Sequence, residues 1–199
     1  MTALPESLPT GRQTRPKPKI RAIILTDRGL KIGDEAPEDL GRNEQVVVIR
    51  PGTWLPPRLA LTTDHLKDSD KVIGGVGNLR IEEVQFDALG SWMFAITGTL
   101  EFSDHPMARQ VESEVLRGNI GYCSAGFVIQ EKHRVGPDRA ETVLGGRFSG
   151  PKQLVTRFWL YECAVTYFPK DFSCKITIEN PAETGGEQEE TSNAVPPTQ

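Results

Sequence analysis

Three side chains of this sequence have types that combine in nucleophilic catalysis: a serine, a glutamate and a histidine. Ser124 lies in the segment 120–130, whose residues alternate between two faces as in a strand, with Gly121 and Gly126 close on either side of it. Because glycine has no Cβ, it lets another backbone or a substrate approach such a serine closely. The same pattern also fits a serine that only forms a hydrogen bond within a crowded sheet.

Glu162 lies in the middle of a largely apolar segment, Phe158 to Thr166. Burying a carboxylate is costly unless it is paired. Two kinds of partner for Glu162 are compatible with the sequence. An arginine such as Arg147 or Arg157 would make the glutamate structural, whereas a histidine would be oriented by it.

Three histidines are available as a general base. His105 stands where a helix is expected to begin, and His133 has charged neighbours that indicate an exposed position. His65 follows Thr62-Thr63-Asp64 and is the best general-base candidate. A base beside a serine hydroxyl takes its proton and makes the oxygen a nucleophile.

The elements that must position these residues are mostly strands. Segments rich in β-branched or aromatic residues, with turn-forming residues near their ends, predict strands at 21–25, 45–50, 72–76, 79–86, 92–101, 120–130 and 154–167. One helix is expected after Asp104 as its cap, with Pro106 in its first turn and Gly118 at its end. Many strands and few helices predict a mainly β (α+β) fold, a barrel or sandwich with helices packed outside.

Length and composition predict one domain with an extension at each end. The chain has 199 residues, of which 37% are hydrophobic and 25% charged, and its net charge is −4. Residues 1–20 are rich in proline and basic, and residues 180–199 are acidic without aromatic residues, so we expect both to be disordered around a domain at 21–179. The acidic balance argues against nucleic acid as a partner. No apolar run approaches about 18 residues, so no membrane span is expected.

The three cysteines, Cys123, Cys163 and Cys174, are an odd count without the short spacing of metal ligands. We expect reduced thiols in a cytosolic compartment, and neither a metal nor another cofactor. A cysteine nucleophile at Cys123 or Cys163 is an alternative enzyme class, but neither residue has an activating sequence context.

Together these segments resemble the prohead protease family of tailed bacteriophages, over about Pro57 to Pro169. His65 with its neighbour Asp64 precedes a glycine-containing strand, as in that family. Ser124 begins a segment similar to the family's Ser-x-Gly-aromatic signature. The segments similar to the family, in chain order, are Ile73-Gly74-Gly75-Val76, Val115-Leu116-Arg117-Gly118 at the end of a helix, Ser124-Ala125-Gly126-Phe127, and Leu160-Tyr161-Glu162-Cys163-Ala164 running on to Phe168-Pro169.

The order and spacing of these segments, rather than any one motif, carry the resemblance. Two positions depart from the family pattern: Ala164 stands where serine is frequent, and Lys170 stands where alanine is common. Neither departure falls on Ser124, His65 or Glu162.

The resemblance implies a β-barrel surrounded by helices, similar to the fold of the herpesvirus capsid protease. It implies a serine endopeptidase in which Ser124 is the nucleophile, His65 the base and Glu162 the acid that orients it. Backbone N–H groups near Ala125-Gly126, or an arginine such as Arg147, would stabilise the oxyanion.

The resemblance also implies where the enzyme acts and on what. The expected place is the assembling prohead in the host cytoplasm, and the expected partners are the major capsid protein, its scaffolding segment and the enzyme itself through autoprocessing. Assembly into a homo-oligomer is left open. The alternative is a non-catalytic β-rich phage structural or capsid-assembly protein, in which the three residues are incidental.

Overall fold

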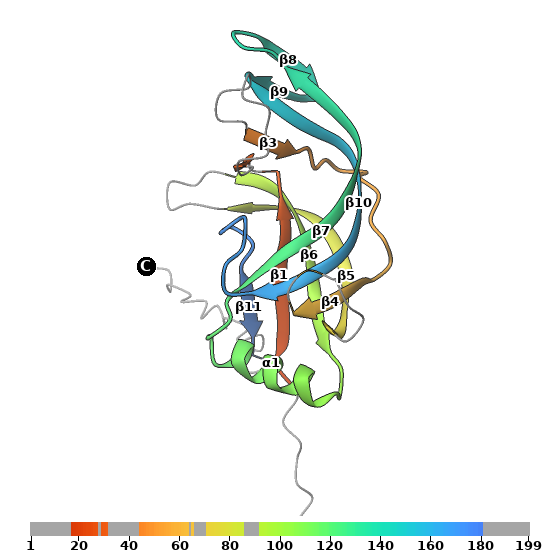
Figure 1. Ribbon diagram of the computed structural model, residues 1–199, viewed down its shortest axis with the longest axis vertical. Helices are drawn as coiled ribbons and strands as arrows, with labels where there is room; N and C mark the ends of the chain where they lie inside the picture. Colours follow the sequence, from red (N-terminus) through yellow and green to blue (C-terminus); the bar gives the residue numbers. More distant parts are fainter. Residues whose placement is uncertain are drawn as a thin grey trace, which may run out of the picture.

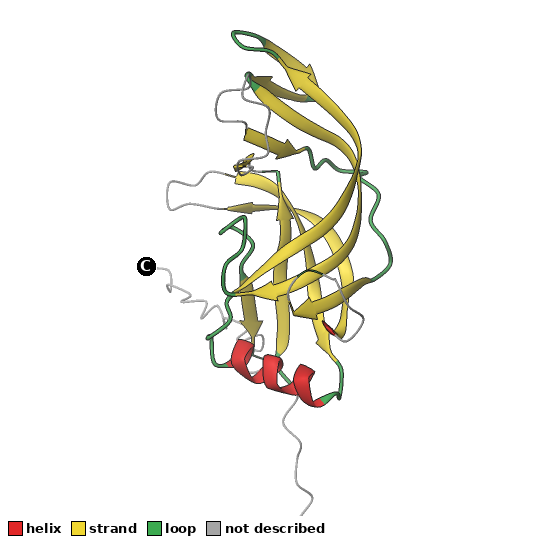
Figure 2. Cartoon of the chain, viewed as in Figure 1, coloured by secondary structure: helices red, strands yellow, loops and turns green. Residues whose placement is uncertain are grey.

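Strands dominate the computed structural model, which describes residues 17–27, 29–31, 44–63, 65, 71–85 and 92–180 (Figure 2). The elements in chain order are β1 (Lys19–Thr26), β2 (Gly29–Lys31), β3 (Glu44–Val47), β4 (Leu59–Thr63), β5 (Val72–Gln85), β6 (Trp92–Phe102), α1 (Pro106–Leu116), β7 (Tyr122–Val135), β8 (Ala140–Val143), β9 (Gly146–Ser149), β10 (Lys152–Thr166) and β11 (Ile176–Glu179). The prediction of a mainly β protein is therefore confirmed.

The long strand β10 organises the main sheet. Along one edge it pairs in parallel with β3, near its start, and with β4, near its end. Along the other edge it pairs with β7 in antiparallel fashion over nearly its whole length. The order of the remaining strands beyond β4 is β5, β6, β1 and β11, and β8 and β9 form a separate two-stranded ribbon. This ribbon and α1 lie at opposite ends of the molecule (Figure 1).

The paired strands leave open edges at β11, at β2 and along β7, so the described strands do not form the closed ring of pairs that defines a barrel. The segment before β11 nevertheless lies between β1 and β7. Ile23 N donates to Lys175 O, and Cys123 N donates to Cys174 O, both at 2.9 Å. The sheet therefore curves until β7 comes near β1.

Helix α1 is the one helix in the described part of the chain, where the sequence predicted a few. Its N-cap is His105 and not Asp104, because His105 Nδ1 accepts from Met107 N at 3.3 Å. Asp104 instead binds the side chain of Arg109 at 2.9 Å. Gly118, with φ +77°, follows the last turn, as the sequence predicted.

The apolar side chains gather in two clusters. The larger one lies between β1, β4, β5, β6, β7, β10 and α1 and includes Ile24, Leu61, Ile96 and Val115, all at most 1% exposed. A smaller cluster around Val46, Val48, Val135 and Leu154 joins β3 to the far ends of β7 and β10.

The first and last strands meet where the domain begins and ends. Lys19 pairs with Glu179 between β1 and β11. Lys19 and Ile20 thus belong to the folded domain, although the sequence placed them in a disordered segment. The rest of the two predicted disordered segments, except Asn180 and residues 17–18, lies outside the described residues. Within the described ranges, no helix is both long and apolar enough to cross a membrane.

Candidate active site

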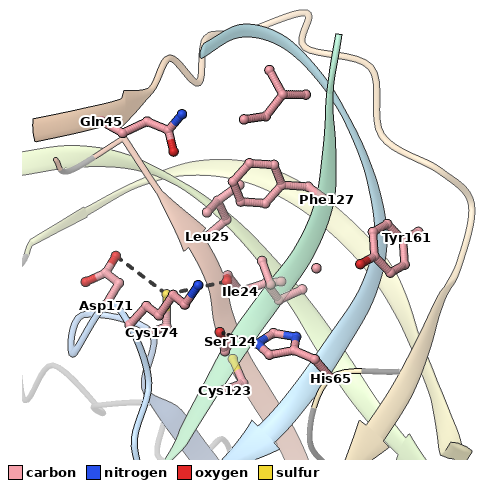
Figure 3. Close-up of a pocket in the computed structure, with 14 residues that line it drawn as sticks. Ile24, Leu25, Gln45, His65, Cys123, Ser124, Phe127, Tyr161, Asp171 and Cys174 are labelled. Atoms are coloured by element: carbon pink, nitrogen blue, oxygen red, sulfur yellow. Dashed lines mark hydrogen bonds between the residues drawn. The ribbon is translucent and has the colours of Figure 1, made fainter. Parts of the chain in front are cut away.

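Ser124, His65 and Glu162 lie together in a chain of hydrogen bonds. Ser124 Oγ is 3.2 Å from His65 Nε2, and His65 Nδ1 is 2.9 Å from Glu162 Oε1. Figure 3 shows Ser124 and His65 facing each other at one end of a pocket. The sequence prediction that these three residues converge is confirmed. Asp64, which formed part of the family resemblance, lies outside the described residues.

Strand β10 brings the three residues together. Glu162 belongs to β10 and pairs with Gly126 of β7, so Ser124 lies two positions along β7, opposite Ala164. On the other edge of β10, Val165 pairs with Thr63, the last residue of β4. His65 follows β4 by two residues, and its ring reaches back to Glu162 Oε1.

The Glu162 side chain is fully buried, and it pairs with the histidine of the site. Arg157 instead pairs with Glu131 at 3.2 Å, and Arg147 belongs to β9 in the separate ribbon. Burial fixes the carboxylate, because a charge removed from water needs its partner close by.

Gly126 makes room for that carboxylate. A Cβ on Gly126 would lie 2.7 Å from Glu162 Cδ and still closer to Cγ and Oε1. From the sequence, the glycines near Ser124 are expected to let another backbone or a substrate approach closely. At Gly126 the group that approaches is the glutamate of the site itself.

The hydrogen-bond chain fixes how the imidazole can act. A carboxylate oxygen accepts, so Nδ1–H of His65 donates to Glu162 and leaves Nε2 free to accept the Ser124 hydroxyl proton. The side chain of His65 is 46% exposed, which leaves the histidine open to a substrate and to water. The 3.2 Å distance is long for such a bond, as is frequent when no substrate is bound.

A pocket of about 470 Å³ adjoins the serine. Its lining residues are Ile24, Leu25, Gln45, His65, Cys123, Ser124, Ala125, Gly126, Phe127, Ile129, Tyr161, Lys170, Asp171 and Cys174. Ala125 and Gly126 thus stay candidates for the oxyanion donors, whereas Arg147 does not line this pocket. Gln45, Tyr161 and Asp171 were not predicted as site residues from the sequence, and Lys170 was noted there only as a departure from the family pattern.

A second histidine–glutamate pair provides an internal comparison. His133 Nε2 lies 2.8 Å from Glu141 Oε2, between β7 and β8. Among the described residues, no serine is hydrogen-bonded to His133. The sequence expected His133 to be exposed, and its side chain is 43% exposed.

The three cysteines are free thiols, and all are buried. Hydrogen bonding to Cys163 and burial raise the pKa of Cys123 well above its ordinary value. Burial and the neighbouring Asp171 carboxylate likewise raise the pKa of Cys174. Because the thiolate is the reactive form, neither residue suits a nucleophile.

Comparisons with protein-family models, with curated proteins and with solved structures find no match to this chain. A function for this protein is therefore inferred from the geometry of the site and from the motifs in the sequence.

Proposed function

We propose that this protein is a serine endopeptidase with Ser124 as nucleophile, His65 as general base and Glu162 as the acid that orients the imidazole. The observation that carries the proposal is the continuous hydrogen-bond chain from Ser124 Oγ through both ring nitrogens of His65 to Glu162 Oε1. Serine, histidine and carboxylate in this arrangement act as a unit on unrelated folds, whatever their order in the chain.

In the first half of the reaction, Ser124 Oγ attacks the carbonyl carbon of a peptide bond while its proton moves to His65 Nε2. The carbonyl oxygen gains the electron pair and becomes an oxyanion, which backbone N–H groups near Ala125 would stabilise. When the electron pair returns, the C–N bond breaks and the amine leaves with the proton from Nε2. Glu162 stabilises the positively charged imidazolium that forms between these steps.

In the second half, a water molecule attacks the ester carbon and gives one proton to His65 Nε2. The carbon–Oγ bond then breaks, and Ser124 Oγ takes that proton back. The products are a carboxylic acid and the free enzyme. The exposed edge of His65 gives water access to the ester.

The motif order of the sequence supports a narrower role as a prohead protease, with a herpesvirus-protease-like barrel as its fold. In that role the substrates are the major capsid protein with its scaffolding segment, and the enzyme itself, inside the assembling prohead. The nearness of β7 to β1 is compatible with such a barrel. Coexpression with a major capsid protein that carries its scaffolding segment should shorten that protein at one defined site with the wild-type chain and leave it intact with Ser124→Ala.

A covalent probe tests the catalytic proposal directly. We expect a small alkyl fluorophosphonate to label one site, which mass spectrometry of peptides places at Ser124. Substitution of His65 by alanine should slow labelling by at least ~100-fold, the usual contribution of a general base.

Two variants serve as controls. Ser149→Ala removes an exposed serine of β9, and His133→Ala removes the histidine of the second histidine–glutamate pair. Both should be labelled at the wild-type rate. An unlabelled Ser124 in the folded, assembled protein would favour the structural alternative.

A further inference from the structure

Much of the wall of the pocket beside Ser124 is apolar. Ala125, Phe127 and Ile129 come from one face of β7, and Ile24 and Leu25 come from β1. In Figure 3, Phe127, Leu25 and Gln45 lie away from Ser124 and His65, toward the other end of the pocket. The pocket is therefore a mostly apolar space that starts at the nucleophile.

Other contacts hold these walls in place. The Phe127 ring packs edge-to-face on Phe158, with ring centroids 5.7 Å apart. Leu25 is only 3% exposed, and Gln45 Nε2 donates to Gln153 Oε1 at 3.1 Å. The volume of about 470 Å³ lies within the range of preformed ligand sites. The pocket is therefore preformed, and its shape can select which substrate side chain binds.

The same strand also offers backbone groups to a substrate. Cys123 N–H donates to Cys174 O on the edge of β7 that faces away from β10. Since backbone groups alternate between the two edges of a strand, Ala125 and Phe127 present theirs to that same edge. Beyond the bridge between Tyr122 and Lys175, no strand of the described residues pairs there. An extended peptide can add as a strand to an edge of this kind.

We infer that the substrate is a peptide that lies extended along this edge of β7 and inserts a bulky apolar side chain, of leucine, methionine or phenylalanine size, into the pocket. That side chain belongs to the residue whose carbonyl Ser124 attacks, because the pocket opens at Ser124. Phe127, Ile129 and Leu25 determine this specificity. The inference rests on the proposed function and adds the substrate class to it.

Basic side chains fit this pocket poorly. Asp171 is the one carboxylate among its lining residues, and it already accepts from Thr26 Oγ1 and Ser173 N. A lysine side chain of the substrate placed among Leu25, Phe127 and Ile129 would lose its water without gaining a free carboxylate as partner. Discrimination against lysine should therefore exceed discrimination against alanine.

Peptidyl aryl phosphonates that differ only in the side chain next to the phosphorus measure this selectivity as a rate of Ser124 labelling. We expect the leucine and phenylalanine probes to react at least ~10-fold faster than the alanine probe, in line with the selectivity of apolar pockets. Phe127→Trp and Ile129→Trp each fill the pocket and should reduce this ratio toward one. Val128→Ala changes an exposed side chain on the other face of the same strand and should keep the ratio.

The ratio is taken within each variant, so a general loss of reactivity cancels. If a tryptophan variant does not fold, Ile129→Ala gives a second test, since a larger pocket should favour phenylalanine over leucine more than the wild type does. Equal rates for all side chains, or a faster reaction with the lysine or aspartate probe, would overturn the inference. If such results came with normal labelling by the small fluorophosphonate, the proposed function would stand; loss of labelling by every probe would remove both.

Discussion

Gly126 and Glu162 occupy directly opposite positions in the antiparallel pair of β7 and β10. The Glu162 carboxylate fills the space that a side chain at position 126 would need. The glycine of the Ser-x-Gly segment thus affects Ser124 indirectly, because it allows Glu162 to lie where it can orient His65.

Gly126→Ala should therefore impair the site more than the fold. The new methyl group must push the Glu162 carboxylate away from His65 Nδ1, because β7 and β10 are fixed by their pairing. We expect fluorophosphonate labelling of Ser124 to slow by at least ~100-fold, and the free energy of unfolding to fall by about 1–3 kcal/mol, as for an overpacked core. Labelling kinetics and urea denaturation measure the two effects.

Gly121→Ala is the matched control for this substitution. A Cβ at Gly121 meets no atom within 4 Å, and its φ is not in the left-handed region. This variant should label at the wild-type rate. Equal slowing of Ser124 labelling in both variants would mean that the crowding of Glu162 is not the cause of the slowing.

Glu162→Gln keeps the size of the side chain and removes its charge. An amide no longer stabilises the imidazolium, and it can donate to His65 Nδ1, which favours the wrong tautomer. We expect Ser124 labelling to slow by ~10²–10⁴-fold, while the circular dichroism spectrum stays unchanged. Glu141→Gln, at the second histidine–glutamate pair, should have no effect on labelling. A Glu162→Gln protein that labels at the wild-type rate would remove Glu162 from the proposed mechanism.

Two residues of the candidate site could be predicted because each breaks a local rule. Glu162 is a carboxylate in an apolar strand, and Ser124 stands near glycines in a strand. His65 was selected only by elimination among three histidines. Its position depends on β4, a short strand that the sequence analysis missed because its pairing with β10 joins residues about 100 positions apart.

Other differences also come from interactions that a local pattern does not contain. The sequence predicted two strands at 72–76 and 79–86, but β5 is continuous, because Asn78 adopts a positive φ of 53° at an irregularity that lets the strand go on. The pocket walls join β1, β3 and β7, which are far apart in the chain. Only the folded sheet places Gln45 and Leu25 beside Phe127.

Asp27 provides a test of the fold that is independent of catalysis. Its carboxylate lies 2.9 Å from Arg50 and accepts from Phe94 N at 3.1 Å. Burial raises the pKa of Asp27 above its ordinary value, and this effect outweighs the opposing effects of Arg50 and Phe94. The folded protein therefore keeps the proton at pH values where the unfolded chain has lost it.

The contribution of Asp27 to stability is then largest below the ordinary carboxyl pKa and falls as the pH rises through the raised pKa of the folded state. We expect Asp27→Asn to gain stability relative to the wild type as the pH rises from about 4 to 7, across the carboxyl range. Urea unfolding at several pH values measures this difference. Asp104→Asn, at an exposed carboxylate, serves as the control. A difference that changes in the opposite direction would show that the Arg50 pair dominates.

The cysteines should be inert in the folded protein. Cys123 and Cys174 are buried thiols with raised pKa values, and Cys123 Sγ donates to Ile23 O at 2.9 Å. We expect iodoacetamide at pH 8 to modify the native protein at least ~100-fold more slowly than the urea-unfolded protein. Mass spectrometry after timed quenching measures both rates. Rapid alkylation of Cys123 in the native state would reopen the alternative of a cysteine nucleophile.

Strand β10 comes late in the chain, and both β4 and β7 reach the site by pairing with it. During translation, the ribosome releases His65 and then Ser124 long before Glu162, so a nascent chain that stops short of Lys152 has no partner to hold the histidine. A domain of this kind folds as a unit once its last strands have emerged. Ribosome-bound chains should therefore stay unreactive toward the probe until β10 is available, which would spare neighbouring nascent proteins from premature cleavage.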